Sequence, residues 1–125
     1  MANSIIHNRK NLSVSLHADA NTTWTIAGNS SVSDIAIGDE VLTGASIKQV
    51  WFGSSSGNGM YWVVKRGANT IGVYDSTGWK DYAGNGNMIN KDSDGSLVVE
   101  LNNPAGGSAY IMIELQKEGT FDKTY

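Results

Sequence analysis

Residues 45–74 read ASIKQVWFGSSSGNGMYWVVKRGANTIGVY, and this stretch decides the fold class of the chain. It contains three short runs of β-branched and aromatic residues, separated by two segments that are rich in glycine, serine and asparagine. Alternating apolar and polar positions bounded by such turn residues are typical of antiparallel strands joined by tight connections. The stretch therefore predicts a β-meander of three consecutive strands.

The composition of the whole chain favours many short strands in one small domain. The chain has 125 residues, 15 of them glycine and only one proline, and it has no cysteine. A chain of this length is expected to form a single domain over residues 1–125, and without cysteine it has no disulfides or thiolate metal sites. Only 17% of the residues are charged, which is too few for a surface of exposed helices.

Further alternating runs lie on both sides of this stretch. They predict additional strands at 12–18, 22–27, 32–37, 96–101 and 108–116. In the last of these, Ile111 and Ile113 face one way and Tyr110 and Met112 the other. Residues 79–90 are expected to be irregular because they are rich in glycine. The pattern predicts an all-β fold, a single-domain antiparallel β-sandwich or jelly-roll-like barrel of about eight strands.

The two ends of the chain differ from the rest. Residues 1–11 and 117–125 are polar and are expected to form extended arms, with the competing interpretation that they are simply frayed. No apolar stretch approaches the roughly 20 residues needed to span a bilayer, and the first residues lack the apolar core of a secretory signal. We therefore expect synthesis in the cytoplasm, with no signal peptide and no transmembrane segment.

No group of residues shows the spacing of a catalytic or metal site. His7 and His17 are isolated, the carboxylates are scattered, and neither a G-x-S-x-G nor an S-x-x-K motif is present. The run NKDSDG at 90–95 resembles the opening of a calcium loop, but an Asp-Gly turn explains the same residues. We therefore expect no catalytic residue, no cofactor and no metal, and the chain is predicted not to be an enzyme.

A nucleic-acid partner is not expected either. The formal net charge is −3, whereas phosphate binding requires a clustered basic face. The local basic pair Lys65 and Arg66 is predicted to lie at a solvated hairpin end.

The aromatic residues are the best candidates for a functional surface. Trp24 and Trp62 are expected in the core. Alternation places Trp51 on the same face as Ile47 and places Phe52 on the opposite face. Exposed aromatic side chains stack on sugar rings or anchor protein interfaces. The residues expected at an interface or ligand site are Trp79, Tyr82, Trp51, Phe52 and Tyr61.

Three segments of the chain resemble small virion structural proteins of marine tailed bacteriophages, of the capsid decoration or cement type. These segments are MANSIIHNRKNLSVSLHADANTTWTIAGNSSVSDIAIGDEV at 1–41, VVKRGANTIGVYDSTGW at 63–79 and AYIMIELQKEGTF at 109–121. The resemblance covers most of the chain and includes no diagnostic motif, so it carries over no functional residue. It implies a β-rich protein that assembles as an oligomer on a particle surface.

Two functions are therefore expected as alternatives. The first is a non-enzymatic capsid decoration protein of the virion, which stabilises a phage head by binding the major capsid protein lattice and copies of itself, as a homo-oligomer. The second is a fibre- or tail-associated carbohydrate-binding module that recognises host surface glycans through Trp79, Tyr82 and the loop at 54–59. Neither function requires nucleic acid or a membrane.

Overall fold

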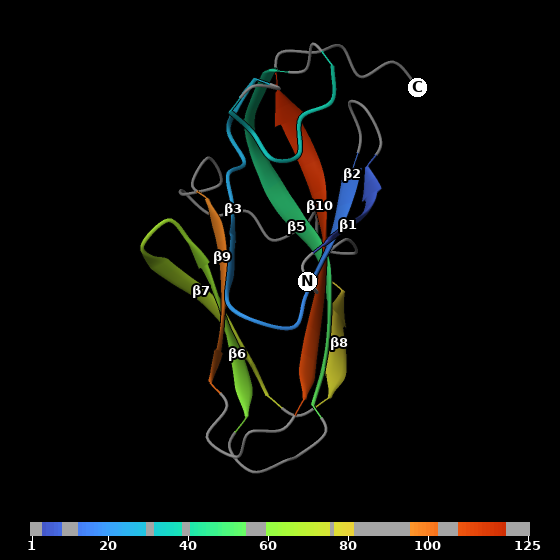
Figure 1. Cartoon of the computed structure of the whole chain (residues 1–125), viewed down its shortest axis with the longest axis vertical. Coiled ribbons are helices and arrows are strands. Elements are labelled where there is room, and N and C mark those ends of the chain that lie inside the picture. The colour runs from blue at the N-terminus through green and yellow to red at the C-terminus, as the bar shows by residue number, and fades with distance from the viewer. Residues whose placement is uncertain are drawn as a thin grey trace.

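The chain is an all-β protein whose strands form two antiparallel sheets packed face to face as a β-sandwich (Figure 1). The computed structural model describes residues 4–8, 13–29, 32–38, 41–54, 60–75, 77–81, 96–102 and 108–119. Within these ranges no helix is present, and hence none that is long and apolar enough to cross a membrane.

Sheet A has the strand order β1-β2-β10-β5-β4, and β8 also pairs with β5. Its strands are β1 (Ser4–Asn8), β2 (Ser13–Ala18), β4 (Gly28–Asn29), β5 (Val41–Ser54), β8 (Gly78–Asp81) and β10 (Ala109–Gly119). Sheet B has the order β3-β9-β6-β7. Its strands are β3 (Thr22–Trp24), β6 (Tyr61–Arg66), β7 (Asn69–Asp75) and β9 (Leu97–Asn102).

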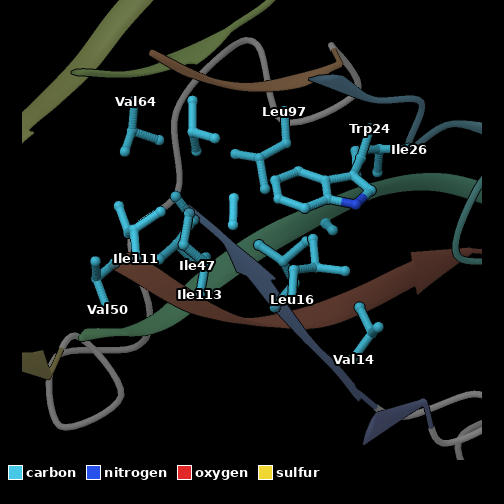
Figure 2. Close-up of a cluster of buried hydrophobic side chains, with 14 of the residues drawn as sticks. Val14, Leu16, Trp24, Ile26, Ile47, Val50, Val64, Leu97, Ile111 and Ile113 are labelled. Carbon is cyan, nitrogen blue, oxygen red and sulfur yellow. The ribbon is translucent and has the colours of Figure 1, made fainter. Parts of the chain in front are cut away.

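The hydrophobic core lies between the two sheets. Trp24 and Trp62 are both buried there, as the sequence predicted. Figure 2 shows Trp24 among aliphatic side chains that project from both sheets. Phe52 of sheet A and Tyr74 of sheet B also meet across this layer, with ring centroids 5.1 Å apart. Burial of apolar surface in this layer is the main force that holds the two sheets together.

The predicted alternation is confirmed wherever a strand has no irregularity. Buried and half-buried positions alternate strictly along β2 and β6. In β10, Ile111 and Ile113 are buried, while Tyr110 is exposed and Met112 is half-buried. Strands at the predicted positions 12–18, 22–27, 96–101 and 108–116 are therefore present, with bounds that differ by a few residues.

The predicted meander is only half correct. β6 and β7 form the expected hairpin, but β5 belongs to the other sheet and pairs with β10, β4 and β8. The inward side chains of β5 and β6 thus face each other across the core instead of lying side by side. This arrangement buries Val50 and Phe52 in the same core as Trp62 and Val64, which a single sheet cannot do without a further covering layer.

A bulge in β5 corrects the predicted faces of that strand. Gln49 pairs with Glu114 and Ile47 with Leu115, so Lys48 is an extra residue without a partner on β10. Because of this extra residue, Ile47 is buried on the same side as Val50, and not on the side of Trp51 as simple alternation predicted.

Residues 32–37 do not form the predicted strand. The Thr25 amide donates to Asp34 Oδ2 at 2.7 Å, and the Asp34 amide donates to the Thr25 carbonyl at 2.8 Å. The Ser33 hydroxyl donates to the Ile26 carbonyl at 2.7 Å. These contacts satisfy the backbone locally, which is the usual way in which serine and aspartate compete with a sheet ladder.

Parts of the two segments predicted as arms belong to strands. The basic pair Lys65 and Arg66 is not a solvated pair, because Arg66 is buried. β1 and the end of β10 lie inside 1–11 and 117–125, and the part of these segments outside the two strands is not described. Lys117 is fully buried. Arg66 is 1% exposed, and its Nη1 donates to the Ala45 carbonyl at 2.7 Å. Alternation along each strand directs both side chains inward, as it does for Val64 and Leu115.

Candidate functional site on the outer face of sheet A

Strand register aligns four side chains in a row across the outer face of sheet A. Met112 of β10 pairs with His17 of β2 on one side and with Trp51 of β5 on the other. Trp51 in turn pairs with Trp79 of β8. We call His17, Met112, Trp51 and Trp79 the aromatic row.

The aromatic row points away from the core because its sequence neighbours point into it. Leu16, Ile111 and Val50 are fully or almost fully buried, so the residues that follow them are directed to the opposite side of the sheet. Trp79 is 54% exposed, and Trp51 is half-buried. Cross-strand partners on one face have Cβ atoms about 5 Å apart, so the two indoles are close enough to form one apolar surface.

The next outward-facing row, two residues along the strands, has a gap at Gly53, which has no side chain. Gly53 pairs with Tyr110, and a Cβ at Gly53 would overlap the Tyr110 ring. The ring therefore lies directly over the Gly53 backbone, where any other residue would exclude it. Tyr110 is nonetheless 40% exposed, so part of its ring faces solvent.

A surface hollow of about 430 Å³ opens beside this ring. Its volume is at the lower end of the range of about 300–1,000 Å³ that is typical of small-molecule sites. The lining combines one aromatic ring with a carboxylate, an imidazole and two aliphatic hydroxyls. The lining residues are His17, Asp19, Gly53, Thr77, Ser108, Ala109 and Tyr110.

Charged groups are few on the described part of this face. Lys48 Nζ and Glu114 Oε2 are 4.0 Å apart, both partly exposed, which is a weak contact. Asp19 and Asp81 are exposed, whereas Lys80 pairs with the inward-facing Val50 and is directed away from this face. The face therefore offers aromatic and hydrogen-bonding groups rather than a strong electrostatic field.

The structure brings together two of the five residues that the sequence nominated. Trp51 and Trp79 are register partners in the aromatic row. Tyr61 lies on the outer face of sheet B, between Asn102 and Asp75, on the far side of the sandwich.

The other two nominated residues are Phe52 and Tyr82. Phe52 is only 5% exposed and packs in the core, so its nomination as a contact residue is corrected. Because alternation places Phe52 opposite Trp51, only one of these two adjacent side chains can face out. Tyr82 lies outside the described residues.

Sequence reasoning missed Tyr110, His17 and Asp19 as members of one site. Alternation did indicate that Tyr110 and Met112 face away from Ile111 and Ile113. It did not reveal that β10 lies between β2 and β5, which is what brings the lining together. Gly53, directly after the Trp51-Phe52 pair, was the one local signal of a gap on this face.

The described residues contain no group of three or more histidine, aspartate or glutamate side chains that could hold a metal ion. The calcium-like run at 90–95 lies outside the described residues. Comparison with protein-family models, curated proteins and solved structures finds no match. What the site can bind is therefore inferred from its geometry.

Proposed function

We propose that this chain is a non-enzymatic structural protein of a virion, which decorates a phage capsid and stabilises it by binding the major capsid protein lattice. The observation that carries the proposal is the aromatic row exposed on the outer face of sheet A. Protein interfaces are enriched in tryptophan, tyrosine and methionine and depleted in lysine and glutamate. The aromatic row contains two tryptophans and one methionine and no acidic or lysine side chain.

The resemblance to decoration proteins supports the same use of this surface. A protein that covers a lattice meets many identical sites, so modest contacts become strong through multivalency. We propose the capsid protein and further copies of this chain as its partners, in the virion after synthesis in the host cytoplasm.

The copy number of the chain in purified particles tests this proposal. Quantitative mass spectrometry relative to the major capsid protein is expected to find on the order of hundreds of copies, as lattice-wide binding requires. A few to a few tens of copies would place the chain on a tail or fibre, and absence from particles would refute the virion function.

A second function is favoured by the hollow beside Tyr110. A fibre- or tail-associated module that binds host glycans needs a concave site with an aromatic surface and convergent polar groups. Tyr110 supplies the aromatic surface, and Asp19 supplies a carboxylate at the rim. Binding assays separate the two functions, because a glycan binder binds host polysaccharide whereas a cement protein co-sediments only with capsids.

A further inference from the structure

We propose that the hollow on the outer face of sheet A is a binding subsite for a single pyranose ring. The Tyr110 ring stacks against the sugar, and the polar groups of the lining bind its hydroxyls. This inference rests on the second function proposed above, and it places the ligand at Tyr110 rather than at Trp79 or the loop at 54–59.

The shape of the hollow follows from the missing side chain at Gly53. Tyr110 of β10 pairs with Gly53 of β5. Thr77 lies next to Gly53 on the other side, because Gly78, which follows Thr77, pairs with Phe52. The Tyr110 ring leans over Gly53, and the remaining space is the hollow, of about 430 Å³. One pyranose ring fits such a volume, which is near the lower limit for small-molecule sites, of about 300 Å³.

The chemistry of the lining matches the two surfaces of a sugar. A pyranose ring presents C–H groups on its faces and hydroxyls around its edge. The C–H groups suit the face of an aromatic ring, which carries partial negative charge. The hydroxyls suit a carboxylate acceptor, and Asp19 is exposed at the end of β2 beside the ring.

The position of the ring also favours stacking. Tyr110 is held from below by the Gly53 backbone, and β10 lies between two partner strands. The aromatic surface thus lies at the hollow on a regular strand, so a ligand can stack on it without a rearrangement of the backbone.

Titration of the isotope-labelled full chain by NMR tests the subsite. The probes are the methyl glycosides of glucose, galactose, mannose and N-acetylglucosamine. At least one is expected to bind with a Kd on the order of millimolar, as a single stacked ring with a few hydrogen bonds should. The saturable shifts should centre on the Gly53 and Tyr110 amides.

Three variants locate the binding. Tyr110→Ala is expected to weaken the affinity about tenfold, as loss of an aromatic contact predicts. Asp19→Asn keeps the size of the side chain and is expected to weaken it by a smaller factor. Tyr61→Ala, which removes a half-buried tyrosine from sheet B, is the matched control and should change nothing.

The outcomes separate this inference from the function on which it rests. Absence of saturable shifts with all four glycosides up to about 100 mM would overturn the subsite. So would unchanged affinity in Tyr110→Ala with a native fold, or shifts centred on Tyr61. If the chain still bound intact host polysaccharide in that case, glycan binding would stand, with its site elsewhere. Failure of both assays would refute the glycan function itself.

Discussion

The outer faces of the two sheets are both formed by antiparallel strands, but they present different side chains. On sheet A, register aligns His17, Met112, Trp51 and Trp79 beside a hollow. On sheet B, Val63 lies between Val73 and Glu100. The next row of sheet B includes Lys65 and Val98.

The inner faces are alike because both must present apolar side chains to the core. An outer face is constrained only by the solvent or the partner that it contacts. Sheet B carries what a solvated β-surface favours, namely β-branched residues and a Lys65–Glu100 ion pair at 3.0 Å. Its one exposed large apolar residue is Val73, 59% exposed. Tryptophan and methionine on sheet A are not needed for solvation, so the difference supports the proposal that sheet A is the binding face.

The largest effect is expected from a deletion that turns buried residues of β10 toward the outer face of sheet A. Deletion of Met112 shifts one half of β10 by a residue, so either Ile113 and Leu115 or Ile111 would turn outward. Loss of one or two such buried residues costs about 2–10 kcal/mol, which is comparable with the whole stability of a typical domain. Circular dichroism should show loss of the native fold.

Deletion of Lys48 is the matched control for this experiment. Lys48 is the extra residue of the bulge in β5, so its removal restores regular pairing and leaves Ile47 and Val50 facing the core. This variant is expected to fold, with a Tm lowered by a few degrees, about 1 kcal/mol. Unfolding of both variants alike would contradict the assignment of the bulge.

The next largest effect is expected on capsid binding. Replacing both Trp51 and Trp79 with alanine should lower the affinity for capsids about 1,000-fold, since buried interface tryptophans contribute about 2 kcal/mol or more each. A control pair on the outer face of sheet B, Tyr61→Ala with Val73→Ala, should change the affinity less than about twofold. Co-sedimentation with purified capsids measures both, and equal losses would remove the distinction between the faces.

A moderate effect is expected from adding one methyl group under a tyrosine in each sheet. In Gly72→Ala the new Cβ would lie 2.7 Å from the hydroxyl of Tyr74, which is 4% exposed and packed against Phe52. This overpacking should cost about 1–3 kcal/mol.

In Gly53→Ala the new Cβ would meet the Tyr110 ring, which is 40% exposed and can swing into solvent. The cost of Gly53→Ala should therefore stay below about 1 kcal/mol. Part of this cost is offset because alanine has less conformational entropy than glycine in the unfolded chain. Urea denaturation of the two variants decides the order, and a larger loss for Gly53→Ala would mean that the Tyr110 ring is fixed in place.

The smallest effect is expected from the surface ion pairs. A double-mutant cycle on Lys65 and Glu100 should give a coupling energy of about 0.5 kcal/mol, reduced by salt. The same cycle on Lys48 and Glu114, 4.0 Å apart, should give a value indistinguishable from zero. A coupling energy above about 1 kcal/mol on sheet A would show that charge organises that face after all.

Much of the core could be predicted from the sequence, and much of the site could not. The buried positions of Trp24 and Trp62 and the outward direction of Tyr110 follow from alternation along single strands. Trp51 and Trp79 were nominated separately, and nothing in their sequence spacing showed that they are partners. Phe52 and Arg66 were misjudged because each was interpreted from its chemical type and not from its phase in the strand.

The sequence by itself determined the class of this protein: short strands of alternating polarity, with Ile111 and Ile113 on the buried side. Only the tertiary structure decided that β5 and β6 lie in opposite sheets and that a bulge reverses the phase at Lys48. It alone placed Tyr110 over Gly53 beside the hollow. The physical reason is that alternation is a local property of the backbone, with a period of two residues. Strand pairing, in contrast, joins residues far apart in the chain and is decided by which faces bury one another.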